Sequence, residues 1–468
     1  MTEQYQLIVV GGGPGGYAAA LQASARGLNA LLIEKGQLGG TCLNEGCIPT
    51  KSFFYSAYLY HKLKEAESHG ITAEKVEVDF SRVQARKQQV VSQLVNGVQD
   101  LLKQAGVTVW KGKARALPGP GKSLEVELSQ GGRKTVSGEN LILATGSQEI
   151  IPQVAGADLP GIMSSREALN LNFLPASLAV IGGGVIAVEM ASIFAAFGVE
   201  VTLIQRSRIL RREDQEMVKR LSLYLRRQGI KIITQAPIEE IKEEPEGYRV
   251  KAQGRKGEEE IFAEKILMAV GRQPYFGDLD LPALPVDYDQ SGLVVDPCME
   301  TSSPGIYAVG DAAAPGYFTA HTAYHQGIVA AENAAGQKAY FEAEAVPYCV
   351  FTSPQLARTG MTEEEAREKG YSIKTSKFPF SANGKAVIQG EGDGIVKIVG
   401  EAPTGKVLGM HILGPQASDL IQEGTLAVAA GCSVANLAQL IHPHPTLSET
   451  VWEAALSFTG HSLHMKGI

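Results

Sequence analysis

The sequence contains the same glycine-rich pattern twice, each time between a short apolar run and a helix-like segment. The first copy is Gly11-Gly-Gly13-Pro-Gly-Gly16, between the apolar residues 5–10 and the alanine-rich residues 17–26. In a βαβ unit the first glycine permits a tight turn, the second lets the backbone approach a pyrophosphate, and the third lets helix and strand pack closely. The helix N-terminus offers free N–H groups and a positive dipole end to the phosphates. The pattern therefore predicts a dinucleotide-binding domain.

A carboxylate follows the first copy at the distance that this kind of domain requires. Residues 30–33 are predicted to form the second strand of the unit, and Glu34 ends it. An acidic residue about 20 positions after the glycines can accept hydrogen bonds from both hydroxyls of a ribose. Because the strand, the helix and the acidic residue all stand at the expected spacing along the chain, a plain glycine-rich turn is the weaker explanation.

The second copy is Gly182-Gly-Gly184-Val-Ile-Ala187, after a predicted strand at 178–181 and at the start of a predicted helix. Alanine at the third glycine position satisfies the same packing requirement. Two such units in one chain suggest that electrons pass between two bound nucleotides. The alternative is one functional site and one evolutionary relic.

Gln205 stands where the first unit has its carboxylate. A neutral amide can hydrogen-bond a ribose hydroxyl, but it does not repel a 2′-phosphate as a carboxylate would. Arg206 and further arginines follow, and an arginine can bind a phosphate through two N–H groups. A solvated basic surface explains most of these arginines equally well. The residues alone therefore leave the choice between NAD and NADP open.

Length and composition exclude several other classes of protein. A chain of 468 residues is too long for one hydrophobic core and should divide into about three or four domains. The formal charge of −7 argues against a general nucleic-acid-binding protein. The sequence has no apolar run long enough to span a membrane, and its first residues lack the pattern of a signal peptide. We therefore expect a cytoplasmic protein that binds neither nucleic acid nor membrane.

Two of the five cysteines, Cys42 and Cys47, lie close together in GGTCLNEGCIPTK. A structural disulfide does not persist in a reducing compartment, so a redox-active or metal-binding pair is the better explanation, ahead of two unrelated buried thiols. A zinc site would need a second pair, which the sequence lacks. In a regular helix the two Cα atoms would lie too far apart to be bridged. A bond would need a distorted helix or one that begins between them, for which Gly46 and Pro49 are suited. Lys51 could stabilise a thiolate or a reduced flavin.

Near the C-terminus, the segment HPHPTLSE contains His444 and Glu449. Thiol–disulfide exchange needs a thiolate, because the neutral thiol is a poor nucleophile. A histidine is the usual base near neutral pH, and a carboxylate fixes its tautomer and raises its basicity. Thr446 and Glu449 also form the pattern of a capping box, a structural role that is compatible with the catalytic one. For His442 we favour a turn residue over a direct role.

In this order, the two glycine-rich patterns, GGTCLNEGCIPTK and HPHPTLSE resemble the flavin-dependent pyridine nucleotide–disulfide oxidoreductases. The resemblance covers nearly the whole chain and is strongest to the members that oxidise dihydrolipoamide. It implies an α/β protein with two Rossmann-like dinucleotide-binding domains and a C-terminal α+β dimerisation domain. The implied domains are 1–150 (first part of the FAD-binding domain), 151–275 (NAD(P)-binding domain), 276–345 (central domain completing the FAD site) and 346–468 (interface domain).

The resemblance also implies roles for individual residues. Cys42 and Cys47 would form the redox-active disulfide, with Cys42 as the interchange thiol that meets the substrate and Cys47 stacked against the flavin. His444 and Glu449 would be the base and its orienting acid, which in this family reach the disulfide of the partner subunit.

Further residues match the cofactor sites of the family. Lys51 and Glu189 match an ion pair beside the reactive nitrogen of the flavin. The residues implied to contact FAD are Gly11, Gly13, Gly16, Glu34, Lys51, Ala114, Thr145, Gly146, Ser147, Asp311 and Ala320. Those implied to contact the nicotinamide nucleotide are Gly182, Gly184, Ala187, Glu189, Gln205, Arg206, Ile238 and Gly271. No metal ligands are implied.

The implied activity is oxidation of protein-bound dihydrolipoamide to lipoamide through the disulfide and FAD, with reduction of NAD. A homodimer is implied, working with a lipoyl-bearing protein of a 2-oxo acid dehydrogenase or glycine cleavage complex. Gln205 departs from the glutamate usual in the family, and TLIQRSRILRRED is closer to mercuric reductases. An NADPH-dependent disulfide reductase or a mercuric-reductase-like enzyme is therefore an alternative. A flavin-based redox sensor is another, although a sensor needs no base for dithiol turnover.

Overall fold

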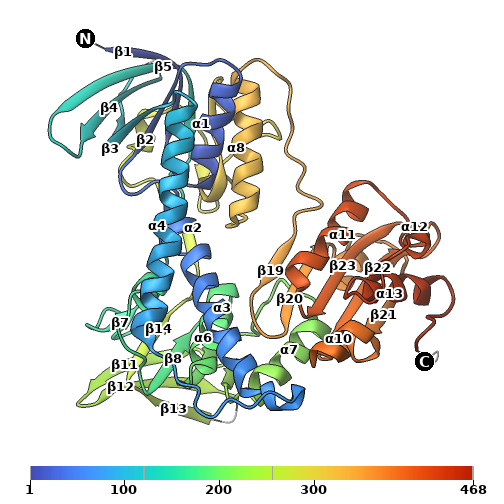
Figure 1. Cartoon of the computed structure of the whole chain (residues 1–468). Helices are drawn as coiled ribbons and strands as arrows, with labels where there is room; N and C mark the ends of the chain where they lie inside the picture. Colours follow the sequence, from blue (N-terminus) through green and yellow to red (C-terminus); the bar gives the residue numbers. More distant parts are fainter. Residues whose placement is uncertain (1, 120–121, 256, 466–468) are drawn as a thin grey trace.

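The first glycine-rich pattern lies in a six-stranded sheet (Figure 1). The computed structural model describes residues 2–119, 122–255 and 257–465. In the first unit, β1 (Glu3–Val10) and β2 (Ala30–Glu34) pair in parallel and α1 (Pro14–Ala25) connects them. The sheet also contains β3 (Thr108–Ala116), β4 (Lys122–Leu128), β5 (Arg133–Leu143) and β18 (Ile306–Ala308). The apolar middle of β1 is fully buried, as expected of a parallel strand covered on both faces.

Four helices of this part of the molecule pack against one another in two pairs. α1 packs against α8 (Ala320–Ala334), a segment far away in the sequence (Figure 1). A Cβ atom on Gly327 would lie 2.2 Å from the carbonyl oxygen of Gly15, so the two helices can approach this closely only because α8 has a glycine there. α3 (Cys47–Lys64) and the long α4 (Phe80–Gln104) pack against each other.

The second pattern lies in a separate sheet of five parallel strands. Its strands are, in spatial order, β10 (Lys231–Thr234), β9 (Glu200–Gln205), β8 (Ser177–Ile181), β14 (Lys265–Met268) and β7 (Ile162–Met163). α6 (Val185–Ala196) follows the glycines and α7 (Gln215–Arg227) follows β9. α6 is apolar on all sides and is accordingly buried over most of its length.

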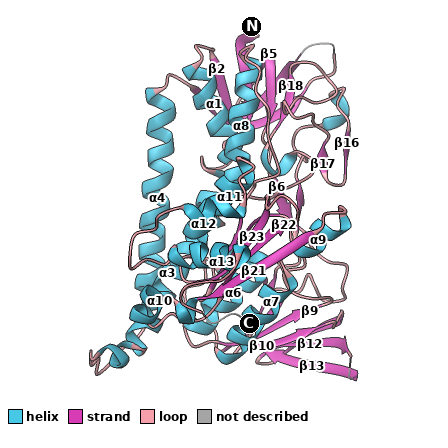
Figure 2. Ribbon diagram, turned by 90° about the vertical axis from the view of Figure 1, so that its right-hand side faces the viewer, coloured by secondary structure: helices cyan, strands magenta, loops and turns pink. Residues whose placement is uncertain are grey.

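Smaller elements connect these two sheets. An antiparallel sheet of β11 (Ile238–Glu244), β12 (Gly247–Gly254) and β13 (Gly257–Ala263) lies at the opposite end of the molecule from the first sheet (Figure 2). The short elements are α2 (Gly40–Asn44), β6 (Ser147–Glu149), α5 (Ser165–Ala168), β15 (Arg272–Pro274), β16 (Tyr288–Asp289) and β17 (Gly292–Leu293). β15 pairs with β6 and so joins the end of the second unit to the first.

The C-terminal part forms an antiparallel sheet with its own core, at the right of Figure 1. Its strands are, in spatial order, β19 (Tyr348–Val350), β20 (Gln355–Gly360), β23 (Val407–Gly414), β22 (Ile395–Glu401) and β21 (Ile373–Pro379). Its helices are α9 (Glu363–Glu368), α10 (Gly384–Gln389), α11 (Ala417–Ala429), α12 (Val434–Gln439) and α13 (Glu449–Thr459). The predicted fold class is confirmed by these sheets. In the described part of the chain, no helix has both the length and the apolar character needed to cross a bilayer.

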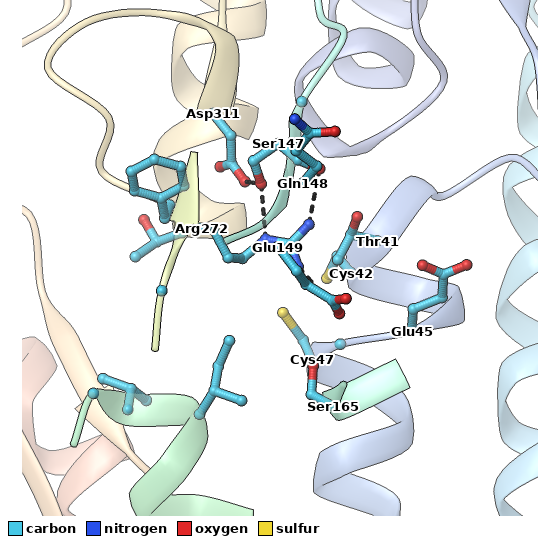
Figure 3. A pocket seen from close by; sticks show the side chains of 18 of the residues that line it. Thr41, Cys42, Glu45, Cys47, Ser147, Gln148, Glu149, Ser165, Arg272 and Asp311 are labelled. Carbon is cyan, nitrogen blue, oxygen red and sulfur yellow. Dashed lines mark hydrogen bonds and ion pairs between the residues drawn. The ribbon is translucent and has the colours of Figure 1, made fainter. Parts of the chain in front are cut away.

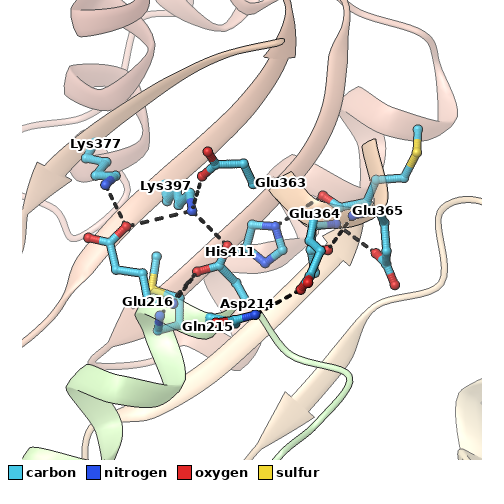
Figure 4. A network of polar contacts seen from close by, with 12 residues as sticks. Asp214, Gln215, Glu216, Glu363, Glu364, Glu365, Lys377, Lys397 and His411 are labelled. Carbon is cyan, nitrogen blue, oxygen red and sulfur yellow. Dashed lines mark hydrogen bonds and ion pairs between the residues drawn. The ribbon is translucent and has the colours of Figure 1, made fainter. Parts of the chain in front are cut away.

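A buried lysine connects the second unit to the C-terminal sheet (Figure 4). Lys397 of β22 is 2% exposed, and its Nζ lies 2.7 Å from Asp214 Oδ2 and 2.8 Å from Glu363 Oε2. Asp214 uses its other oxygen to cap α7, accepting the N–H groups of Glu216 and Met217. Burial also lowers the pKa of the neighbouring His411 to about 4, so this ring stays neutral near pH 7. Removal of Lys397 would therefore leave the buried carboxylate of Asp214 without its ion-pair partner, whereas Glu363 would keep Arg367 at 2.6 Å.

We expect Lys397→Met to lower the free energy of unfolding by about 3–5 kcal/mol, because a broken buried ion pair leaves an uncompensated charge. The matched control is Lys377→Met, which removes the same charge from a side chain that is 41% exposed and pairs with Glu216. The control should cost about 1 kcal/mol or less. Thermal unfolding of both variants measures the difference, and equal losses would contradict the role given to the buried pair.

Candidate active site

The two dinucleotide units open onto one cavity of about 1970 Å³. A site for one drug-sized ligand measures about 300–1,000 Å³, so this volume accommodates more than one such molecule. The predicted cofactor residues that line it are Gly11, Gly13, Glu34, Lys51, Ala114, Thr145, Gly146, Ser147, Asp311, Ala320, Gly182, Gly184, Glu189, Gln205, Arg206, Ile238 and Gly271. Gly16 and Ala187 are buried in packing positions behind it.

The first fingerprint has little room for side chains. Gly11 has φ of +105°, and a Cβ there would lie 2.2 Å from the carbonyl oxygen of Ala144. A Cβ on Gly16 would lie 1.8 Å from the carbonyl oxygen of Gly11. Gly13 caps α1 without any side chain accepting the first N–H groups of the helix. These N–H groups remain available to an anion at the cavity wall.

The carboxylate of Glu34 is held in place by the backbone of the same unit. Its Oε2 accepts the N–H of Gly12 at 2.6 Å, and its Oε1 accepts the N–H of Gly36 at 2.5 Å. Each carboxylate oxygen keeps a further lone pair, so the group can still accept hydrogen bonds from a ribose. Binding of a ribose by Glu34 stays a prediction.

Two buried polar side chains line the inner part of the first cofactor site, and one of them has no hydrogen-bond partner in the described structure. Thr145 Oγ1 is buried and has no hydrogen-bond partner in the described structure. Asp311 is buried, which raises its pKa, and it accepts a hydrogen bond of 2.6 Å from Ser147 Oγ (Figure 3). A buried hydroxyl without a partner and a buried carboxylate beside a phosphate-binding turn fit a large polar cofactor such as FAD.

Arg272 is a site residue that the sequence analysis did not single out. Its Nε donates to Ser147 Oγ at 2.8 Å, and its Nη2 donates to the Ser147 carbonyl oxygen at 2.8 Å (Figure 3). Its charge also offsets part of the burial effect on the pKa of Asp311. The segment MAVGRQP contains this arginine, but only the pairing of β15 with β6 brings it to the first unit.

The glycine-rich turn of the second unit is as tightly packed as that of the first, but the side chain at the end of its second strand is neutral. Gly182 has φ of +135°, and a Cβ there would lie 2.1 Å from the carbonyl oxygen of Ala269. Gln205 Oε1 accepts the backbone N–H of Arg206 at 2.9 Å. The exposed side chains of Arg206, Arg211 and Arg212 line the cavity at this end. The structure thus places these three arginines along the same cavity as Gln205.

The cysteine pair lies at a break between two helices. α2 ends at Asn44 and α3 begins at Cys47, with Gly46 as the non-helical cap residue before α3, so a helix begins between the two cysteines as the sequence analysis required for a bond between the thiols. The two thiols are free and their sulfur atoms point toward each other (Figure 3), close enough for each thiol to change the pKa of the other.

The two thiols differ in acidity. The hydrogen bond from Cys42, together with the charge of Lys51, lowers the pKa of Cys47 to about 7 despite its burial. The same hydrogen bond and burial raise the pKa of Cys42. As the pH rises, Cys47 therefore loses its proton before Cys42 does. The roles predicted for the two thiols require this order of acidity.

A buried ion pair separates the cysteines from the second unit. Lys51 Nζ of α3 lies 2.8 Å from Glu189 Oε2 and 3.0 Å from Glu189 Oε1 of α6. Glu189 is 4% exposed and also accepts the backbone N–H of Phe351 at 2.9 Å. The pair lines the cavity where the two dinucleotide units meet.

His444 and Glu449 contact each other but do not line this cavity within one chain. His444 Nδ1 lies 2.9 Å from Glu449 Oε1, and Glu449 Oε2 accepts the N–H of Thr446 at 2.8 Å. The carboxylate therefore holds the proton on Nδ1, and Nε2 of this 75% exposed ring is free to act as a base. Burial opposes the ionisation of Glu449, but the N–H of Thr446 and then His444 lower its pKa overall.

The predicted capping box is only half formed. Glu449 accepts from the Thr446 backbone, but Thr446 Oγ1 donates to the carbonyl oxygen of Pro443 at 2.8 Å instead of capping the helix. α13 begins at Glu449 with Ser448 as its cap residue, which is two residues later than a box at Thr446 requires. The hydroxyl of Thr446 therefore closes the proline-containing turn instead of capping α13.

Comparisons with known proteins agree with this site. The family model "Pyridine nucleotide-disulphide oxidoreductase" matches residues 5–327, and the model of its dimerisation domain matches residues 346–455. A dihydrolipoyl dehydrogenase of Bacillus subtilis is 41% identical over 98% of this chain and 99% of its own length. A dihydrolipoyl dehydrogenase of Thermus scotoductus is 42% identical over 98% of this chain and 99% of its own length. The flavoprotein disulfide reductase RclA of Escherichia coli superimposes with a TM-score of 0.85 at 30% identity, covering 97% of this chain and 99% of that one.

We expect Gly16→Ala to destabilise the protein by more than about 3 kcal/mol, because the new methyl group overlaps a backbone carbonyl that cannot move away. The matched control is Gly97→Ala in α4, where a Cβ meets nothing within 4 Å. The control should stabilise the protein by about 0.5–1 kcal/mol, because alanine is the better helix former. Thermal unfolding of both variants measures the difference, and a Gly16→Ala protein as stable as the wild type would contradict the packing described here.

Proposed function

This chain belongs to the pyridine nucleotide-disulphide oxidoreductase family, and we propose that it is a dihydrolipoyl dehydrogenase. The family resemblance and the assignment as an FAD-dependent oxidoreductase, both predicted from the sequence, are confirmed. The observation that carries the proposed activity is the pair Cys42 and Cys47, hydrogen-bonded beside Lys51 at the meeting point of the two dinucleotide units.

The proposed reaction begins with the base. His444 Nε2 of one subunit takes a proton from a dihydrolipoyl thiol, and the resulting thiolate attacks Cys42 of the partner's disulfide. The bond between Cys42 and Cys47 breaks, and Cys47 leaves as a thiolate. The second substrate sulfur then closes the oxidised ring, which releases Cys42 as the other thiol. The low pKa of Cys47 makes it the better leaving group, which favours attack at Cys42.

Glu34, Thr145, Ser147 and Asp311 would hold FAD in the first unit. Bound FAD supplies the electron acceptor for the two thiols and the donor of a hydride to the nicotinamide nucleotide. Lys51 places a positive charge near the thiols, and Glu189 fixes its position.

We propose NAD as the nucleotide at the second unit and keep NADP as the alternative. The arginines beside Gln205 favour that alternative, because they line the cavity and no carboxylate there would repel a 2′-phosphate. An NADPH-dependent disulfide reductase or a mercuric-reductase-like enzyme would use the same surface. The contact between His444 and Glu449 argues against a flavin-based redox sensor, which has no need of a base.

The match to the family's dimerisation domain supports a homodimer. The partner that we propose is a lipoyl-bearing protein of a 2-oxo acid dehydrogenase or glycine cleavage complex, and the proposed location is the cytoplasm. We also propose domain boundaries at residues 150, 275 and 345. They are supported by the return of β18 to the first sheet and by the separate C-terminal sheet, although Met1 and residues 466–468 of the outer domains lie outside the described residues.

The purified protein should reduce NAD with dihydrolipoamide as the donor, followed by the absorbance of the reduced nucleotide. Parallel assays with NADP test the alternative, since a higher kcat/KM for NADP would assign the arginines to a 2′-phosphate. Parallel assays with NADPH and oxidised glutathione or Hg²⁺ test the reductase alternatives. Slow turnover of dihydrolipoamide with both nucleotides would reject the proposed activity.

The two thiols should give different spectra when each is replaced. Cys42→Ser keeps a hydroxyl that can donate to Cys47 and keeps the charge of Lys51 nearby, so Cys47 should still ionise and give a long-wavelength absorbance beside oxidised flavin. Cys47→Ser should lack this band near neutral pH, because burial still raises the pKa of the remaining thiol. Absorption spectra of the flavin-loaded variants during a pH titration measure this, and a band in Cys47→Ser alone would reverse the assignment of the two roles.

A further inference from the structure

The imidazole of His442 makes two polar contacts that its sequence position did not suggest. Its side chain is 8% exposed. Nδ1 lies 3.3 Å from the carbonyl oxygen of Leu440, and Nε2 lies 3.1 Å from Oε1 of Glu423 in α11. The ring also packs beside the indole of Trp452 in α13, at 6.4 Å between centroids. A simple turn residue would not need a carboxylate from another helix.

Both atoms that face the imidazole nitrogens are hydrogen-bond acceptors. A neutral imidazole carries one N–H, so it can satisfy only one of them. The other contact would then place a lone pair against a lone pair in a largely buried position, which is costly. The imidazolium form satisfies both contacts. The hydrogen bond to Glu423 correspondingly raises the pKa of His442.

The charge on His442 also acts on the acid that holds the proposed base. The titratable groups that influence His442 in the described structure are Glu423 from α11, which it contacts, and Glu449 from α13, which contacts His444. Glu449 adds to the upward shift of the pKa of His442, and His442 in turn contributes to lowering the pKa of Glu449. The two histidines of HPHPTLSE thus share one electrostatic environment.

We propose that His442 is a positioning residue, held as an imidazolium by Glu423, that anchors the turn carrying His444 and keeps Glu449 ionised. The anchor joins the turn to α11, so Nε2 of His444 projects from a fixed support. The positive charge helps to keep Glu449 ionised, so that its carboxylate can hold His444 in the tautomer with a free Nε2. The proposal deepens the proposed function and rests on it, because it gives His444 the task of deprotonating the dithiol.

The first test is the pH dependence of kcat/KM for dihydrolipoamide in the flavin-loaded enzyme. Loss of the imidazolium removes one of the influences that lower the pKa of Glu449, so in His442→Gln the acidic limb should move to higher pH by about half to one unit. Glu423→Gln should move it in the same direction, because His442 then loses its proton more readily. His461→Gln is the control, since it removes an exposed histidine of the same domain.

A loss of activity that is equal at every pH would indicate a merely structural role and would overturn the proposal. Reduction of ferricyanide by the reduced nucleotide does not use the dithiol base, so it reports whether each variant retains its flavin. If the wild type reduces ferricyanide but does not oxidise dihydrolipoamide, the proposed function is wrong. That result would say nothing against the ionisation of His442, which the second test measures separately.

The second test observes the ionisation directly and needs no turnover. Histidine labelled with ¹³C in the ring gives one NMR resonance for each imidazole, and the resonance absent from His442→Gln identifies this ring. Its midpoint should lie above about 6.5, the value of an unperturbed histidine, and should fall in Glu423→Gln. A midpoint at or below that value in the wild type, or one that Glu423→Gln leaves unchanged, would overturn the proposal.

Discussion

The ion pair between Lys51 and Glu189 is the contact on which the arrangement of the active site depends. Glu189 is almost completely buried, and withdrawing such a charge from water costs several kcal/mol unless a counter-charge and hydrogen bonds replace the solvent. Lys51 and the N–H of Phe351 provide that replacement. Because Lys51 lies in the first turns of α3 and Glu189 lies in α6, the pair sets the distance between the two dinucleotide units.

The same lysine contributes to the asymmetry of the two thiols. Cys47 lies at the first position of α3, where the helix N-terminus and Lys51 both favour negative charge, while Cys42 lies in the preceding short helix. A helix break at Gly46 thus does more than bring two sulfur atoms together. It gives them different environments, so one is suited to leave as a thiolate and the other to meet an incoming sulfur.

Charge pairs also organise the C-terminal turn, at some distance from the cavity of its own chain. Glu449 uses both oxygens, one for His444 and one for the backbone of Thr446, which fixes the histidine tautomer. The exposure of His444 suits a group that acts on another subunit, and in a dimer this turn would complete a site that neither chain has alone. The ion pair between Lys397 and Asp214 joins the C-terminal sheet, which carries this turn, to the second dinucleotide unit (Figure 4).

The amino-acid sequence alone determined the local features: both dinucleotide units, Glu34, the cysteine pair and the histidine–glutamate couple. Each depends on residues that are neighbours along the chain, where strand, turn and helix propensities act over short distances. The tertiary structure decided what depends on distant segments. It brought Arg272 to Ser147 through a strand pairing, turned the expected capping box into a differently closed turn, and placed Glu423 against His442. Hydrogen bonds and charges act through space and depend on burial, and a sequence contains neither distance nor burial until the chain has packed.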